Sequence, residues 1–172
     1  MVQAERKTQH VLMVIDKSPG SLRAAEYSGN LLRHCTGFRI HLLHLLPPLP
    51  PRLLEFGGSE DPRKEQLLDN ELRRDQQKWI KSARKSAEPS VERAVEVLRK
   101  AGITSRNIFH EFSYPTESRD AARTVLEYAH AKKCHTIILG HKAHSWFREV
   151  AGADLTEHIL RQARGISVWV VQ

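Results

Sequence analysis

With 172 residues, 40% of them hydrophobic and 27% charged, the chain has the composition of an ordinary globular domain and is long enough to bury a core without disulfides. No apolar run approaches the roughly 20 residues that cross a bilayer, and residues 1–10 lack the apolar centre of a secretory signal. We therefore expect a cytoplasmic protein without membrane contact, folded as one domain over residues 1–172. Its two cysteines, Cys35 and Cys134, are too few for a disulfide framework and are predicted to be buried free thiols.

The formal net charge of +7 raises nucleic acid as a partner. Basic residues exceed acidic ones by three in residues 1–50, by two in 51–100 and by two in 101–172. At this scale the excess is spread along the whole chain. The balance therefore favours weak, salt-sensitive binding of polyanions at most, and no specific nucleic-acid partner.

The first 50 residues predict two buried strands around a helix. Residues 10–15 are consecutively apolar, which is typical of a strand buried on both faces. Apolar residues then recur near helical spacing from Leu22 to Cys35, and Gly37 suits the position just after a helix. Residues 39–46 predict the second strand, which the prolines of segment 47–51 end.

Between residues 52 and 102 the sequence becomes charged and favours helix. A long amphipathic helix is predicted to begin at Pro62, to be kinked or restarted at Pro89, and to end at Gly102. Its buried stripe is expected to contain Leu67, Leu68, Leu72 and Trp79. The extended loop and helix around residues 47–75 form an insertion whose role the sequence leaves open.

The last 70 residues repeat the alternation of strand and helix. Residues 107–112 alternate in polarity, as a half-exposed edge strand does, and residues 135–140 and 167–172 predict two further strands. Helices are expected around residues 121–129 and 153–165. Five strands alternating with four helices predict an α/β fold with a parallel sheet covered on both faces.

Several motifs occur in an ordered series along this pattern. They are Asp-x-Ser at 16–18, His-Leu at 44–45, Ile-Ile-Leu-Gly at 137–140, Glu-His-Ile-Leu-Arg at 157–161 and Val-x-Val-Val at 168–171. In these motifs the chain resembles the universal stress protein (UspA-like) family along nearly its full length. The resemblance implies a single-domain, Rossmann-like sheet of order 3-2-1-4-5, of the adenine nucleotide alpha hydrolase-like kind.

In such a sheet, ligands bind outside the carboxyl ends of the strands where the strand order reverses. The candidate nucleotide pocket implied by the resemblance consists of Asp16, Lys17, Leu45, Leu139, Gly140, Lys142, Ala143, Ala153 and Asp154. Asp16 matches the family position that holds adenosine. From the residues alone, an Asx-type turn with Ser18 is an equally good interpretation of that aspartate.

The phosphate part of this pocket is degraded. Nucleotide-binding members of the family carry Gly-x2-Gly-x9-Gly followed by Ser or Thr. Here Gly140 keeps the first glycine, Ala143 and Ala153 replace the other two, and Asp154 takes the hydroxyl position. Asp154 is expected to cap the last helix, so that its carboxylate occupies the amides that would hold phosphate. A close negative charge costs about 4 kcal/mol at an effective dielectric near 20, or roughly a thousandfold in affinity.

We therefore expect no nucleotide cofactor, no metal and no catalytic residues, in a homodimeric stress-response binding or signalling module. The alternative is an ATP- or AMP-binding member that acts as a nucleotide-dependent switch or slow ATPase. A third possibility is an anion site at Lys142 and Arg148, and a metal site at His44, His141 and His144 is disfavoured. The resemblance implies that two copies pair through the bare apolar strand Ser167, Val168, Trp169, Val170 and Val171.

Overall fold

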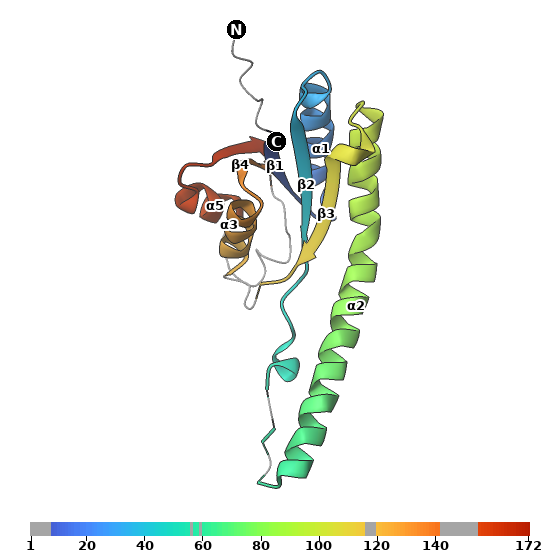
Figure 1. The fold of residues 1–172 in the computed structure, drawn as a ribbon, viewed down its shortest axis with the longest axis vertical. Coiled ribbons are helices and arrows are strands. Elements are labelled where there is room, and N and C mark those ends of the chain that lie inside the picture. The colour runs from blue at the N-terminus through green and yellow to red at the C-terminus, as the bar shows by residue number, and fades with distance from the viewer. Residues whose placement is uncertain (1–7, 56, 59, 116–119, 142–154) are drawn as a thin grey trace.

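The computed structural model describes residues 8–55, 57–58, 60–115, 120–141 and 155–172. Its centre is a five-stranded parallel sheet of order β3-β2-β1-β4-β5, which confirms the predicted fold (Figure 1). The strands are β1 (Gln9–Ile15), β2 (Phe38–Leu45), β3 (Ile108–Ser113), β4 (Cys134–Gly140) and β5 (Ser167–Val171). Each predicted strand lies within one or two residues of an observed one.

Burial explains the strand order. Residues 12–15 of β1 and 137–139 of β4 are completely buried, because helices cover both faces of the central strands. β3 lies at one edge with mostly half-buried or exposed side chains, as its alternating sequence predicted. No helix in the described ranges combines the length and the hydrophobicity of a transmembrane segment.

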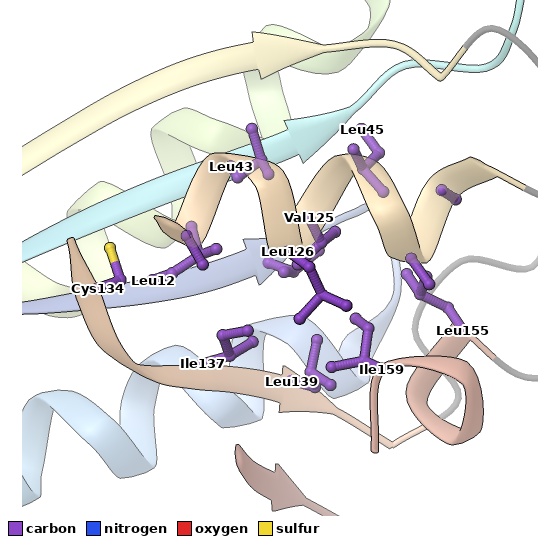
Figure 2. Close-up of a cluster of buried hydrophobic side chains, with 14 residues drawn as sticks. Leu12, Leu43, Leu45, Val125, Leu126, Cys134, Ile137, Leu139, Leu155 and Ile159 are labelled. Carbon is purple, nitrogen blue, oxygen red and sulfur yellow. The ribbon is translucent and has the colours of Figure 1, made fainter. Parts of the chain in front are cut away.

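One face of the sheet packs against α3 (Ala121–Ala131) and α5 (Leu155–Gln162). Figure 2 shows how side chains from β1, β2 and β4 meet those of the two helices in a single apolar layer. Leu12, Leu43, Leu139, Val125 and Ile159 are all essentially inaccessible to solvent. Each such side chain contributes about 1.5–3 kcal/mol by leaving water, so this layer is a main source of stability.

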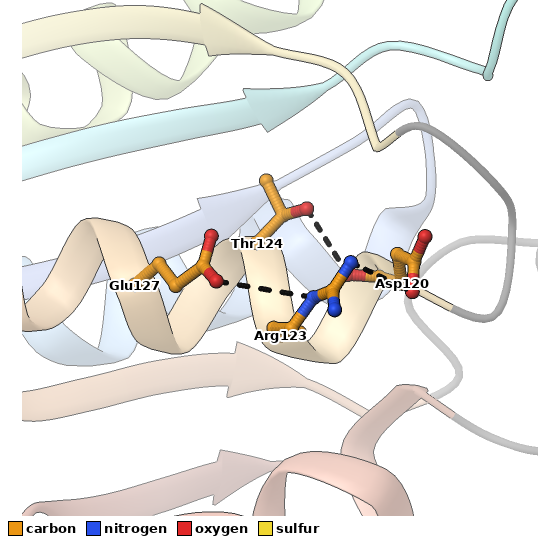
Figure 3. Close-up of polar contacts among 4 residues, drawn as sticks. All are labelled: Asp120, Arg123, Thr124 and Glu127. Atoms are coloured by element: carbon orange, nitrogen blue, oxygen red, sulfur yellow. Dashed lines mark hydrogen bonds and ion pairs between the residues drawn. The ribbon is translucent and has the colours of Figure 1, made fainter.

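The outward side of α3 is held by local polar contacts (Figure 3). Arg123 lies 3.1 Å from the carboxylate of Asp120 and 3.8 Å from that of Glu127. The hydroxyl of Thr124 donates to the Asp120 carbonyl oxygen at 3.0 Å. Such exposed pairs add only a few tenths of a kcal/mol each, so packing of the apolar side dominates the placement of α3.

The other face of the sheet packs against α1 (Pro19–Leu32) and the C-terminal part of α2 (Pro62–Lys100). α2 is one helix of 39 residues, and its N-terminal half extends beyond the sheet (Figure 1). Its buried residues are Ala87, Val91, Ala94 and Leu98. The predicted buried stripe is therefore wrong in position. Leu67 is 64% exposed, and Leu68, Leu72 and Trp79 are only half-buried, because this part of the helix has no sheet beneath it.

The helix also runs through Pro89 without the predicted restart. A proline in a helix leaves the carbonyl four residues earlier without its N–H donor. Pro89 and Lys85 are both exposed, so water can bond to that carbonyl. Burial of Ala87 and Val91 on either side of Pro89 holds the helix against the sheet across this position.

Part of the segment between β2 and α2 runs outward from the sheet beside the extended half of the helix (Figure 1). It contains a short 3-10 helix, Pro51–Leu53, in which Leu53 is 8% exposed. The side-chain amide of Gln76 donates to the Leu53 carbonyl oxygen at 2.8 Å. The inner side of the extended half is thus covered in part by the chain itself.

The two cysteines are free, but they differ in environment. Cys134 is buried at the start of β4, and burial raises the pKa of its thiol to about 11. Cys35 is exposed, so the prediction of a buried thiol is wrong there. The reason is that α1 ends at Leu32, which places Cys35 in the turn before β2.

Candidate functional site

The turn between β1 and α1 is built around Asp16. The backbone N–H and the hydroxyl of Ser18 both donate to Asp16 Oδ1, at 2.9 and 2.5 Å. Ser18 in turn caps α1 by accepting from the Ser21 N–H at 3.2 Å, and the Ser21 hydroxyl donates to the Asp16 carbonyl oxygen. The Asx-type turn expected from the sequence is therefore present, and it gives the buried Asp16 carboxylate a structural role.

A cavity of about 460 Å³ opens beside this turn, between the carboxyl ends of β1 and β2 and the helix α2. Its lining is formed by Asp16, Lys17, Ser18, Pro19, His44, Leu45, Leu46, Pro47, Ala83, Ser86 and Ala87. The ammonium group of Lys17 donates to the Ser86 hydroxyl at 2.8 Å and so links the β1–α1 turn to α2. The volume is that of a small-molecule site, and its walls are mainly apolar.

Three of the predicted site residues, Asp16, Lys17 and Leu45, meet at this cavity. Leu139 instead belongs to the apolar layer under α3 and α5, and Gly140 lies buried against α1. The remaining four, Lys142, Ala143, Ala153 and Asp154, lie outside the described residues, as do His144 and Arg148. Their contribution to a phosphate site therefore stays a prediction.

Gly140 is required by close packing of backbones. A Cβ added there would lie 2.3 Å from the carbonyl carbon of Gly20 and 2.6 Å from the amide nitrogen of Ser21. Conversely, a Cβ on Gly20 would lie 2.6 Å from the carbonyl oxygen of His141. The first turn of α1 thus sits directly on the end of β4, which explains a glycine at position 140 without any ligand.

The sequence did not identify the wall of the cavity that α2 provides. Ala83, Ser86 and Ala87 continue the helical spacing of Val91, Ala94 and Leu98, so an extended helical projection would have placed them on the inner side. His44 is one of the three histidines of the disfavoured metal site. It is 5% exposed, and its ring lies 5.9 Å from that of Phe112. In the described part of the chain, no cluster of three or more histidine, cysteine or carboxylate side chains is arranged to hold a metal ion.

A second histidine pair lies away from the cavity, towards the opposite ends of β1 and β2. His10 Nδ1 lies 2.9 Å from His41 Nε2, and the two rings stack 5.1 Å apart. Burial is the main cause that lowers the pKa of each histidine. The neighbouring charged or titratable groups are Arg39, Glu111, Lys132, Lys133 and His135. Folding therefore favours the neutral form of both rings relative to the unfolded chain.

This pair predicts a loss of stability in mild acid. Because the folded-state pKa of His41 lies below the unfolded value near 6.5, the unfolded chain binds more protons as the pH falls below about 6.5. The contribution of the pair is complete above that pH and decreases below it, by at most about 1.4 kcal/mol per pH unit for His41. Urea unfolding at a series of pH values measures this slope.

Replacement of His41 by leucine should flatten the slope below pH 6.5, because the buried titrating group is removed. His34→Asn is the matched control, since His34 is exposed after the end of α1. An unchanged slope in the His41→Leu variant would show that other groups govern the acid response.

The fold and the site define the class of protein to which the chain belongs. It has a doubly wound parallel sheet, with a cavity of about 460 Å³ at the carboxyl ends of β1 and β2. The model of the universal stress protein family matches residues 7–172. The chain is therefore a member of the universal stress protein family.

Solved structures of the family share the fold at low sequence identity. A universal stress protein from Burkholderia pseudomallei is 15% identical, with 98% of each chain covered and a TM-score of 0.60. The protein UspA from Lactobacillus plantarum is 16% identical over 96% of this chain and 99% of its own, also with a TM-score of 0.60. A universal stress protein in complex with cAMP is 16% identical over 95% and 96% of the two chains, with a TM-score of 0.56. No curated protein shows significant similarity to the chain.

Proposed function

We propose that the protein is a cytoplasmic, non-enzymatic and homodimeric stress-response module in which ATP binding is degraded or absent. The observation that carries this proposal is the engagement of Asp16, the residue that matches the adenosine-holding position of the family. Its Oδ1 accepts two hydrogen bonds from Ser18, in a turn that also caps α1. The sequence adds the loss of two of the three phosphate-loop glycines, at Ala143 and Ala153.

The alternative function is binding of ATP or AMP as a switch, or slow hydrolysis of ATP. The cavity beside Leu45 supports it, because its volume of about 460 Å³ suits a nucleoside. Two similar structures contain nucleotides: one is the complex with cAMP, and the other is an Archaeoglobus fulgidus universal stress protein in complex with dAMP. Among the described residues of this cavity, a phosphate would find one cation, Lys17, which already donates to Ser86.

The nucleotide content of the purified protein distinguishes the two functions. We expect the supernatant of the denatured protein to contain no stoichiometric adenine nucleotide, and calorimetric titration with ATP and AMP to give no heat of binding. Stoichiometric ATP or AMP in the supernatant would establish the alternative.

The homodimer is proposed from the exposed edge of the sheet. In the described part of the chain β5 pairs with β4 alone, and no Lys or Pro interrupts its apolar residues. Tyr27 and Leu31 on α1 are 55% and 50% exposed, and they line one groove with Trp169 and Val171. An apolar strand edge beside an apolar helix surface supports pairing with a second copy.

Replacement of Val170 by lysine should convert the dimer to monomer. Two lysines brought together across the two-fold axis repel each other, and a charge on an edge strand opposes pairing. We expect at least tenfold weaker association in sedimentation equilibrium, on the order of 1.4 kcal/mol or more. Leu160→Lys is the control, because Leu160 is a similarly exposed apolar residue on α5. A monomeric parent protein, or equal loss in both variants, would contradict pairing through β5.

A further inference from the structure

The outward side of the extended half of α2 carries basic and neutral side chains only, from residue 63 to residue 85. At 100° per residue, these positions fall within an arc of about 140° on one side of the helix. We call this surface the basic ridge. It consists of Arg63, Gln66, Leu67, Asn70, Arg73, Arg74, Gln77, Lys78, Lys81, Arg84 and Lys85, all of which are exposed.

The acidic residues of the same half of the helix, Glu65, Asp69, Glu71 and Asp75, lie beside or behind this arc. Asp69 pairs with Arg73 at 2.9 Å, and Asp75 pairs with Lys78 at 3.0 Å. The other five cations of the basic ridge form no salt bridge with any described residue. One of these five, Arg84, lies over the Phe112 ring of β3, with its guanidinium carbon 5.8 Å from the ring centroid. Four cations of the ridge, Arg63, Arg74, Lys81 and Lys85, therefore have no salt-bridge or ring partner among the described residues.

The architecture makes this surface accessible. The ridge lies on the side of α2 opposite Leu72, Trp79 and Ala83, and it extends past the end of the sheet (Figure 1). Its 22 helical steps span about 33 Å. The net charge of residues 51–100 does not reveal the basic ridge, because the acidic residues Glu88, Glu92 and Glu96 follow on the same helix and offset its cations in the count.

We propose that the basic ridge binds the phosphate backbone of a nucleic-acid duplex without sequence specificity. Arginine, lysine, asparagine and glutamine are the side chains that bond to phosphates along a duplex. Single strands are disfavoured, because the ridge has no aromatic residue for base stacking and Trp79 lies on the opposite side. An anionic membrane is disfavoured because Leu67 is the one apolar side chain on the ridge.

A second copy of the chain fits the ridge less well. Antiparallel pairing of two α2 helices would place its cations against Glu88, Glu92 and Glu96 of the other copy. The gain from such exposed ion pairs is smaller than the entropy lost on association. Binding to DNA or RNA instead gains entropy from released counterions, which makes the same cations far more effective.

Fluorescence anisotropy with a labelled DNA duplex of about 20 base pairs tests the proposal in the full-length protein. If the four cations Arg63, Arg74, Lys81 and Lys85 each meet a phosphate, the logarithm of the affinity should fall with the logarithm of the salt concentration with a slope of about −3.6. The double variant Lys81→Glu/Lys85→Glu should bind at least tenfold more weakly. Glu88→Lys/Glu92→Lys, which lengthens the ridge, should bind several-fold more tightly.

The matched control is Arg23→Glu/Arg33→Glu, which makes the same change in net charge at two exposed positions of α1 and its C-cap. It should retain most of the affinity, and thermal melts establish that every variant is folded. Equal losses in the control and in the ridge variant would overturn the proposal, because net charge alone would then explain the binding. Tighter binding to anionic vesicles than to the duplex would also overturn the proposal. So would association of the Lys81→Glu/Lys85→Glu variant with the Glu88→Lys/Glu92→Lys variant when neither associates alone, because the ridge would then bind a second copy of α2.

Discussion

Replacement of Gly140 by alanine is expected to destabilise the protein by about 3 kcal/mol, the upper part of the range for overpacked cores. The added Cβ would lie within 2.6 Å of three backbone atoms of Gly20 and Ser21. No side-chain rotation relieves such contacts, so α1 and β4 must separate. Since roughly 2–4 °C of melting temperature correspond to 1 kcal/mol in a chain of this size, the melting temperature should fall by about 6–12 °C.

The control for this experiment is Gly58→Ala, since a Cβ at Gly58 would meet no atom within 4 Å. Gly140 does not have the positive φ that favours glycine, which the structure shows at Gly37, Gly102 and Gly165. Close packing is therefore the full structural reason for this glycine. A Gly140→Ala variant as stable as the control would show that α1 does not rest on the end of β4 in solution.

The second large effect is expected from restoring the phosphate loop. The triple variant Ala143→Gly/Ala153→Gly/Asp154→Ser should gain up to about a thousandfold in ATP affinity, because one close negative charge is removed and two backbone segments are opened. These positions lie outside the described residues, so the prediction rests on the family pattern in the sequence. Isothermal titration with ATP measures the gain.

The double variant Ala143→Gly/Ala153→Gly, which keeps Asp154, separates the two causes. It should bind ATP far more weakly than the triple variant, because the carboxylate stays in place immediately before α5. Equal affinity in the double and triple variants would remove the charge explanation. No gain in either would show that the described cavity cannot hold the nucleoside, or that the loop does not approach the phosphates.

The sequence predicted the sheet well because each central strand carries its own signal. Residues 11–15 and 137–139 are apolar on both sides, and only a position between two helical layers suits such a run. The turn at Asp16 was predictable for a similar reason, since Ser18 follows at the spacing of an Asx-type turn.

The extended half of α2 was not predictable in the same way. Leu68, Leu72 and Trp79 follow the helical spacing of a buried stripe, but periodicity does not state where the sheet beneath the helix ends. The predicted kink or restart at Pro89 is absent for a different reason. The carbonyl that loses its N–H donor is exposed, and water can replace the missing hydrogen bond there. The α2 wall of the cavity depends on both facts, and therefore only the structure could place it.

The length of α2 also has a mechanical consequence. Ser86 borders the cavity, while Pro62 lies 24 residues away at the far tip, about 36 Å along the same unbroken rod. A tilt of about 5° around the cavity would carry the tip sideways by roughly 3 Å. A small displacement of α2 beside Lys17 and Ser86 therefore produces a larger displacement of the N-terminal end of the same helix.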